Sequence, residues 1–105
     1  MKTTELKQNL FIIILRYKAS LEKIDALRAS HLEFLQHHYD SNIFITSGPQ
    51  VPRNGGIILA KCDTKDRLQA IITKDPFAIN DLATYEIIEF APTKWSNLFG
   101  NILFD

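Results

Sequence analysis

The sequence predicts an α+β domain with the element order β-α-β-β-α-β, a ferredoxin-like arrangement in which one antiparallel sheet carries both helices on one face. Three observations favour this class. Four short runs are rich in β-branched and aromatic residues, and two stretches between them repeat apolar residues every three or four positions. The chain has 105 residues, which fits one domain with a core of its own.

The first strand and the first helix have the strongest local signals. Residues 10–15 form a continuous apolar run, which is typical of a strand buried on both faces. Ser20 is a good N-cap residue, and the apolar positions that follow it predict an amphipathic helix from about residue 21 to residue 38. The polar residues at 40–42 favour a turn that ends this helix.

The rest of the chain predicts a hairpin, a second helix and a last strand. The expected bounds are a strand at 43–46 closed by a turn at 47–49, a hairpin loop at 50–56, a strand at 57–62, a helix at 65–74 and a strand at 84–90. Asp63 and Thr64 are expected to cap the second helix, and Pro76 cannot continue it. Residues 95–104 form an apolar tail that is expected to contain a short helix.

Charge and composition exclude several classes of partner. Lysine and arginine together number 12 and so do aspartate and glutamate, so no basic field attracts nucleic acid or an anionic membrane. Strands of isoleucine and leucine also lack the surface aromatics with which an RNA-recognition sheet stacks bases. The run at 10–15 is too short to span a bilayer and resembles no export signal. The single cysteine, Cys62, cannot form an internal disulfide, and these features together favour a cytoplasmic protein.

The first and third predicted strands are apolar on both of their faces. Two helices can cover only one face of a four-stranded sheet, so a single copy would leave a large apolar area in water. We therefore expect a homodimer in which a second copy covers the other sheet face. The expected domain is 1–94, and the tail at 95–105 is expected to pack on the domain or on the dimer partner.

His31 and Asp75 are the candidate catalytic residues. His31 shares an apolar helical stripe with Leu27 and Phe34, so its imidazole should face the sheet and needs a polar partner. Asp75 stands at the turn that ends the second helix and could supply that partner, which would make a minimal general acid/base unit. Each residue also has a structural role open to it: His31 could bond a backbone carbonyl, and Asp75 could bond the amides of its own turn.

Other patterns in the sequence point to chemistry less strongly. Ser47 lacks the glycines on both sides that mark a strained nucleophile turn, so it is more typical of a strand-ending turn that helps line a pocket. His31 and His38 share a helix face, but two helical turns separate them by about 10 Å, which is too far for one metal ion. Gly55 and Gly56 match neither a phosphate-binding loop nor a dinucleotide fingerprint. We therefore expect no metal site.

Four segments of the chain resemble one family. They are RASHLEFL in the first helix, SGP after the second strand, GGIILA in the third strand and KDPFAINDL before the last strand. These segments are similar to the YciI-like (YCII-related) proteins over about residues 9–94, and the tail after Lys94 has no counterpart in the pattern. The resemblance implies a dimeric ferredoxin-like domain of the dimeric α/β-barrel type, similar in architecture to muconolactone isomerases.

The resemblance also implies roles for individual residues. His31 corresponds to the acid/base of the proposed family centre, Asp75 to the residue that orients it, Ser47 to a position at the pocket edge and Arg28 to an anion-binding group. Some relatives act as dehydrochlorinases in haloaromatic breakdown. The implied function is a small-molecule enzyme, in need of no cofactor, for elimination or isomerisation of a small cyclic substrate that can carry a carboxylate. The residues leave two alternatives open, a non-catalytic dimeric module that binds a small ligand and a purely structural His–Asp pair.

Overall fold

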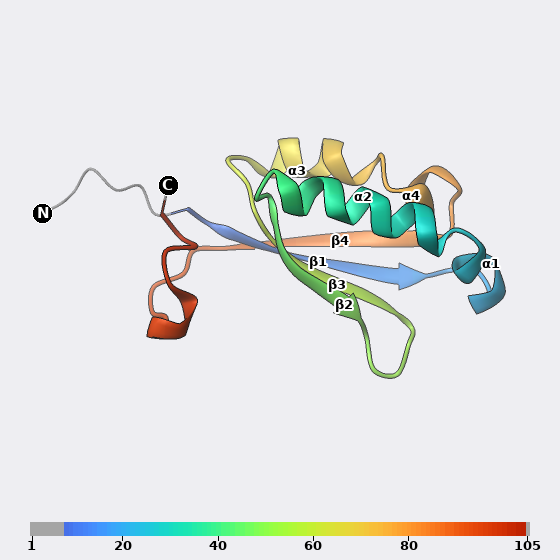
Figure 1. Ribbon diagram of the computed structural model, residues 1–105, viewed down its shortest axis with the longest axis horizontal. Helices are drawn as coiled ribbons and strands as arrows, with labels where there is room; N and C mark the ends of the chain where they lie inside the picture. The colour runs from blue at the N-terminus through green and yellow to red at the C-terminus, as the bar shows by residue number, and fades with distance from the viewer. Residues whose placement is uncertain (1–7, 105) are drawn as a thin grey trace, which may run out of the picture.

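The structure, a computed structural model that describes residues 8–104, is an antiparallel sheet with most of its helices packed on one face (Figure 1). The strands are β1 (Leu10–Tyr17), β2 (Phe44–Pro49), β3 (Gly55–Lys61) and β4 (Ala83–Phe90). The helices are α1 (Leu21–Ala26), α2 (Arg28–Asp40), α3 (Lys65–Ile72), α4 (Pro76–Ile79) and the one-turn 3-10 helix η1 (Asn97–Phe99).

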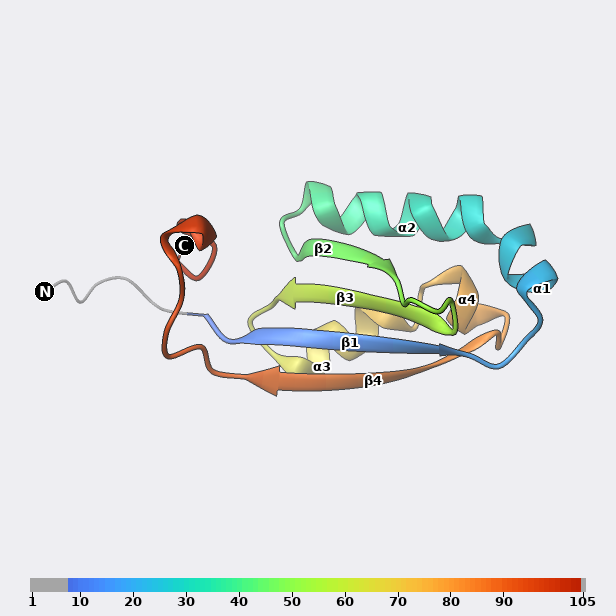
Figure 2. The same cartoon turned by 90° about the horizontal axis from the view of Figure 1, so that it is seen from below.

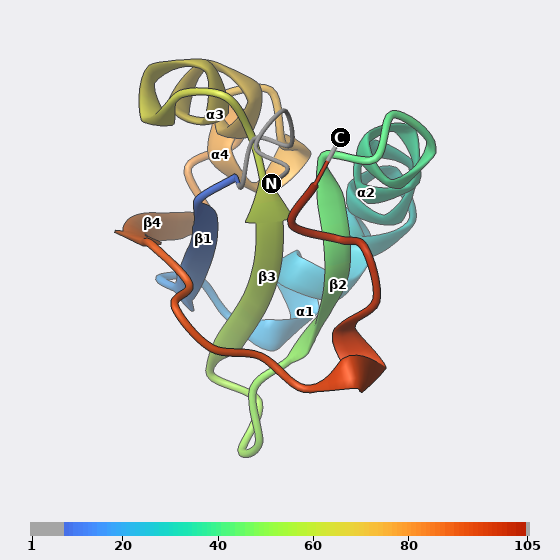
Figure 3. The ribbon, with the colours of Figure 1, turned by 90° about the vertical axis from the view of Figure 1, so that its left-hand side faces the viewer.

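The strand order β2-β3-β1-β4 confirms the predicted ferredoxin-like α+β class. β1 is central and pairs antiparallel with β3 on one side and β4 on the other, and β2 forms the far edge beside β3 (Figure 2). Viewed along the sheet, α3 and α4 lie over the β1 and β4 side and α2 lies over the β2 side (Figure 3). The α3 and α4 helices thus cover one half of a sheet face, and α2 covers the other half of the same face.

The alternation of side chains along β1 places the core on the helix side of the sheet. Phe11, Ile13 and Leu15 are at most 2 % exposed, whereas Ile12 and Ile14 between them point to the opposite face and are only partly buried. Full burial of a side chain of this size contributes about 1.5–3 kcal/mol to folding. The apolar run at the start of the chain therefore serves two surfaces, and only one of them is covered within a single copy.

The single helix predicted at 21–38 is wrong, because the chain forms two helices that meet at Leu27. Ser20 caps α1 as expected, since its hydroxyl accepts a hydrogen bond from the backbone amide of Lys23. Leu27 has φ −108° and ψ 6°, which ends α1 and lets α2 start in a new direction. No glycine or proline marks this break, so the local sequence carries no signal for it.

The turn predicted at 47–49 is also wrong, because β2 extends through these residues to Pro49. Ser47 and Gly48 pair with Ile58 and Ile57 of β3, and a register shift follows Phe44. Pro49 can occupy this place because β2 is an edge strand, where a missing amide donor is tolerated. Because of this extension, Ser47 belongs to the edge strand of the sheet and lies beside Ile58 of β3.

Pro76 does not continue the second predicted helix, as expected, and it begins a further short helix. α3 ends at Ile72, and Asp75 is the N-cap of α4, with Pro76 in its first turn. Proline suits this position because the first helical amide has no intrahelical partner to lose. Thr64 caps α3 by accepting a hydrogen bond from the amide of Arg67, as the sequence indicates.

The tail leaves β4 and turns back beside the start of β1. The backbone amide of Gln8 donates to the carbonyl of Leu103 at 2.7 Å, and Leu103 is almost fully buried. Leu98 in η1 is 97 % exposed, so the tail also presents apolar surface to solvent. Within residues 8–104, no helix has the length and apolar character needed to cross a membrane.

Gly55 should be intolerant of a side chain, because it lies against the backbone of β1. A Cβ at Gly55 would stand 1.8 Å from the carbonyl oxygen of Leu15, whereas a Cβ at Gly48 on β2 meets nothing within 4 Å. We expect Gly55→Ala to lower the free energy of unfolding by about 1–3 kcal/mol, the usual cost of overpacking. Urea denaturation checks this against Gly48→Ala, and equal unfolding free energies for the two variants would contradict the close approach.

Candidate functional site

His31 and Asp75 are in direct contact although 44 positions separate them. The Nδ1 atom of His31 lies 2.8 Å from Oδ1 of Asp75. His31 stands in the first turns of α2 and Asp75 caps α4, and these two helices pack against each other. The juxtaposition follows from the fold, since both helices lie on the same sheet face.

Asp75 is a fully buried carboxylate, 0 % exposed, and each of its oxygens accepts hydrogen bonds. Oδ1 accepts from His31 and also from the backbone amide of Phe77 at 3.0 Å, and Oδ2 accepts from the hydroxyl of Tyr85 at 2.7 Å. Burial of an unpaired charge is very costly, so these donors are what makes a carboxylate tolerable at this place. Asp75 therefore connects α4 and β4 to the imidazole of His31.

Tyr85 is a member of this network that the sequence analysis missed. It lies on β4, in the phase of the strand that faces the helices, and it contributes a hydroxyl to Asp75. Burial, reinforced by the negative charge of Asp75, raises the pKa of Tyr85 far above its ordinary value. Tyr85 therefore remains a proton donor to the carboxylate over the whole range in which proteins are folded. Its inward position in an alternating strand was the available signal.

The His31 ring is held on a flat aromatic surface. Its centroid lies 4.1 Å from that of Phe77, and the two planes differ by only 13°. With Nδ1 bound to Asp75, the ring turns its other nitrogen, Nε2, away from the carboxylate, and no described residue forms a hydrogen bond with Nε2. The side chain keeps 13 % of its surface accessible. One ring nitrogen is thus fixed and the other is available to a ligand.

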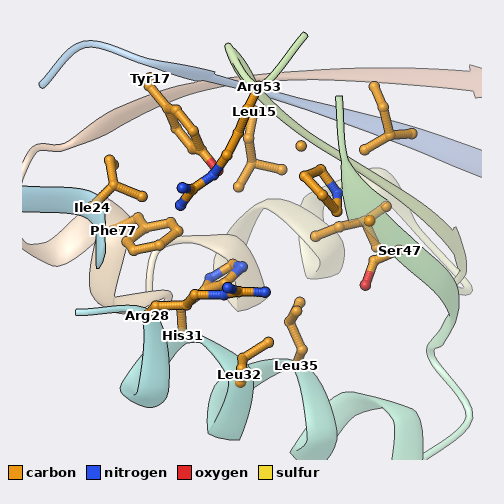
Figure 4. A pocket seen from close by; sticks show the side chains of 15 residues that line it. Leu15, Tyr17, Ile24, Arg28, His31, Leu32, Leu35, Ser47, Arg53 and Phe77 are labelled. Atoms are coloured by element: carbon orange, nitrogen blue, oxygen red, sulfur yellow. The ribbon is translucent and has the colours of Figure 1, made fainter. Parts of the chain in front are cut away.

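A cavity of about 340 Å³ opens beside this ring, between α2, the end of α1 and strands β1, β2 and β3 (Figure 4). Its size is that of a site for a small organic molecule. The apolar part of its wall comes mainly from large aliphatic and aromatic side chains, namely Leu15, Ile24, Leu32, Leu35, Ile57, Ile58 and Phe77. Polar side chains form the smaller part of the wall.

Arg28 and Ser47 both line the cavity, but on different sides of it. Figure 4 shows Arg28 beside His31 at one side and Ser47 at the other. Arg28 is exposed, and no described residue forms an ion pair or hydrogen bond with its guanidinium. The hydroxyl of Ser47 is hydrogen-bonded to that of Tyr39, with no bond to His31. Ser47 therefore has no adjacent base that could activate it as a nucleophile.

Arg53 and Tyr17 also line the cavity, and the sequence analysis did not select them. Arg53 lies in the loop between β2 and β3, its Nη2 donates to Oδ1 of Asp25 at 2.5 Å, and its guanidinium carbon lies 6.0 Å from the Tyr17 ring centroid. That hydrogen bond holds the pKa of the Asp25 carboxyl below its usual range. In the sequence, Arg53 follows closely after the segment 47–49 that was expected to lie at the pocket edge. This closeness was the signal that could have identified this side of the cavity.

The three histidines of the chain do not gather at one point. Within residues 8–104, no group of three or more histidine, cysteine, aspartate or glutamate side chains is arranged to hold a metal ion. His31 is hydrogen-bonded to the Asp75 carboxylate, whereas His37 and His38 lie further along α2, with their ring centroids 4.9 Å apart. The site is therefore built from a His–Asp–Tyr network, a cavity and nearby arginines.

Two solved structures share this fold at low sequence identity. One is 5-chloro-2-hydroxyhydroquinone dehydrochlorinase (TftG) from Burkholderia phenoliruptrix AC1100 in complex with 2,5-dihydroxybenzoquinone. It has 18% identity and a TM-score of 0.66, and the match covers 83% of this chain and 93% of that one. The other is SnoaB, a cofactor-independent oxygenase from Streptomyces nogalater, with 13% identity and a TM-score of 0.50, covering 85% and 96%.

The sequence itself identifies a family. Among curated proteins none matches this chain significantly. The model of the YCII-related domain, however, matches residues 10–91, from the start of β1 to just past the end of β4. That span includes His31, Asp75 and Tyr85 and leaves out the tail. By this match over most of its length, the chain belongs to the YCII-related family.

Proposed function

We propose that this protein is a small-molecule enzyme in which His31 and Asp75 transfer a proton on a small cyclic substrate. The observation that supports the proposal is the 2.8 Å contact between a fully buried carboxylate and an imidazole whose other nitrogen is unpaired beside a cavity. The Asp75 carboxylate accepts a hydrogen bond from Nδ1–H of His31. This hydrogen bond favours the tautomer in which Nε2 carries no proton and can act as a base. Tyr85 and the Phe77 amide hold Asp75 for that task.

The proposed step is removal of a proton from a carbon or hydroxyl group next to a carbonyl. Nε2 of His31 takes the proton, and the electron pair of the broken bond moves into the substrate ring. In an elimination that pair expels a leaving group such as chloride, and in an isomerisation the imidazolium returns the proton at another atom. Arg28 would attract an anionic oxygen of the substrate, and Ser47 would contact its far side.

The two solved structures of similar fold support a reaction on a small molecule. One is a dehydrochlorinase bound to a dihydroxybenzoquinone and the other is described as a cofactor-independent oxygenase. A flat oxygenated ring fits the dimensions of a cavity of about 340 Å³ with apolar walls. We therefore favour hydroxylated or chlorinated cyclic compounds as first candidates.

We also propose that a second copy covers the bare face of the sheet. On that face Ile12 of β1 pairs with Leu59 of β3 and Ile88 of β4, which makes an apolar row across three strands. Ile88 is 41 % exposed in the single copy, and Phe90 further along β4 is 39 % exposed. Burial of these side chains against a second copy would remove the apolar surface from water. The exposed Leu98 of the tail would extend that contact.

His31→Gln is expected to lower kcat by about 10²–10⁴, the usual contribution of a positioned acid/base. The reaction is followed by chloride release from chlorinated hydroxyquinols and by absorbance changes of small lactones. His37→Gln on the same helix, which does not line the cavity, is the control and should keep the wild-type rate. An unchanged rate in His31→Gln would remove the imidazole from the mechanism, and saturable ligand binding with no chemical change in the wild type would favour a binding module.

Tyr85→Phe should separate the support of Asp75 from the size of the tyrosine ring. The change leaves Oδ2 of a buried carboxylate without its donor, so the free energy of unfolding should fall by about 1–3 kcal/mol. Because the carboxylate orients His31, kcat should fall while KM changes little. Thermal unfolding and steady-state kinetics measure the two effects. Wild-type stability and kcat together would contradict a role for this hydroxyl.

Ile12→Lys should dissociate the proposed dimer, because it places a charge in the middle of the apolar row. Sedimentation velocity at micromolar concentration should show a dimer for the wild type and a monomer for the variant. Gln69→Lys, which adds the same charge on the exposed side of α3, should remain dimeric. A wild-type monomer under these conditions would overturn the proposal.

A further inference from the structure

A second hollow, of about 350 Å³, lies between α2 and α3 on the outer side of the helical layer. Four of its lining side chains are basic or can become so: His37, His38, Arg67 and Lys74. Among the described residues that line it, none is acidic. The positive charges of Arg67 and Lys74 beside this open hollow would attract a ligand of opposite charge.

The charged groups around this hollow have few partners of their own. Lys74 forms no ion pair within residues 8–104, and the only ion pair of Arg67 is an exposed contact of 3.3 Å with Asp63 on its own side of α3. The ring of His38 is half-buried, and its Nδ1 is buried without a hydrogen-bond partner. Burial first, and then the nearby His37, Arg67 and Lys74, lower the pKa of His38.

The floor of the hollow is apolar. Phe34 and Ile71 line it, and the Phe34 ring lies 4.9 Å from the ring of His38 in an edge contact. A ligand that matches these walls has an anionic group for the basic side chains and a small apolar body for the floor.

We propose that the hollow between α2 and α3 is a binding site for a small organic anion, such as an aryl or alkyl phosphate, held by Arg67, Lys74 and the two histidines. This site is distinct from the catalytic cavity, because His31, Arg28 and Leu35 face the cavity whereas His37 and His38 face the hollow. α2 thus carries one site on each of two sides. The anion would offset the positive charges of Arg67 and Lys74 and so favour the protonated form of His38.

The chain contains three histidines, so the imidazole region of an NMR spectrum can report on both sites at once. The probe is phenyl phosphate, with benzyl alcohol as its uncharged counterpart, titrated into the full-length wild-type protein at neutral pH. Single His→Gln variants assign the three signals. Saturable shifts of the His37 and His38 signals by phenyl phosphate, with no saturation of these two signals by benzyl alcohol, are the expected result, and any shift of the His31 signal reports separately on the first cavity.

Arg67→Gln tests the charge requirement and should weaken phenyl phosphate binding about tenfold, as expected for loss of a charge-assisted contact. Lys65→Gln on the same helix removes an equal charge outside the hollow and should leave the dissociation constant within about twofold, because an exposed distant charge is screened. Circular dichroism and thermal unfolding check that both variants fold; Arg67 is exposed, so both should.

Three outcomes would overturn the site. They are the absence of saturable shifts at millimolar phenyl phosphate, equal weakening by Arg67→Gln and Lys65→Gln, and shifts confined to His31. The result does not depend on the proposed chemistry, because His31→Gln should leave phenyl phosphate binding at the hollow unchanged even if it abolishes turnover.

Discussion

The buried carboxylate of Asp75 is the constraint around which this molecule is arranged. A negative charge with no exposed surface is tolerated only because three donors reach it, from α2, from the backbone of α4 and from β4. These donors tie the layer of helices to the sheet and to each other. Pro76 begins the short helix α4, and Asp75 is its N-cap. At this position the backbone amide of Phe77 supplies one of the three hydrogen bonds to Asp75. Fold and site therefore depend on the same side chain.

Much of the fold could be predicted from the sequence because its signals are local. The apolar run of β1, the cap at Ser20 and the cap at Thr64 each have a periodic or chemical signature, and each of these elements begins at the residue where it was expected. The break at Leu27 and the extension of β2 to Pro49 were not predicted. Both features depend on tertiary packing. The break at Leu27 lets α1 and α2 take different directions. The extension of β2 follows from its pairing with β3.

The candidate site divides in the same way. His31 and Asp75 could be selected because an imidazole on an apolar stripe requires a partner, and the family pattern pointed to the same pair. Tyr85 and Arg53 could not be selected with equal force. A tyrosine in a strand is ordinary, and only the register of β4 against β1 shows that Tyr85 reaches Asp75. Arg53 lies in a loop, where the sequence does not fix where a long side chain will point.

The double duty of Asp75 has an evolutionary consequence. A descendant without the proposed chemistry would still need the His–Asp–Tyr contacts to keep its interior intact, so selection for folding alone would preserve them. Retention of His31 and Asp75 in a relative therefore reports on structural integrity and is a poor indicator of turnover. Arg28 is different, because it lines the cavity, is exposed to solvent, and its guanidinium has no hydrogen bond or ion pair among residues 8–104. Drift at Arg28 would be the earlier sign that a lineage has abandoned its ligand.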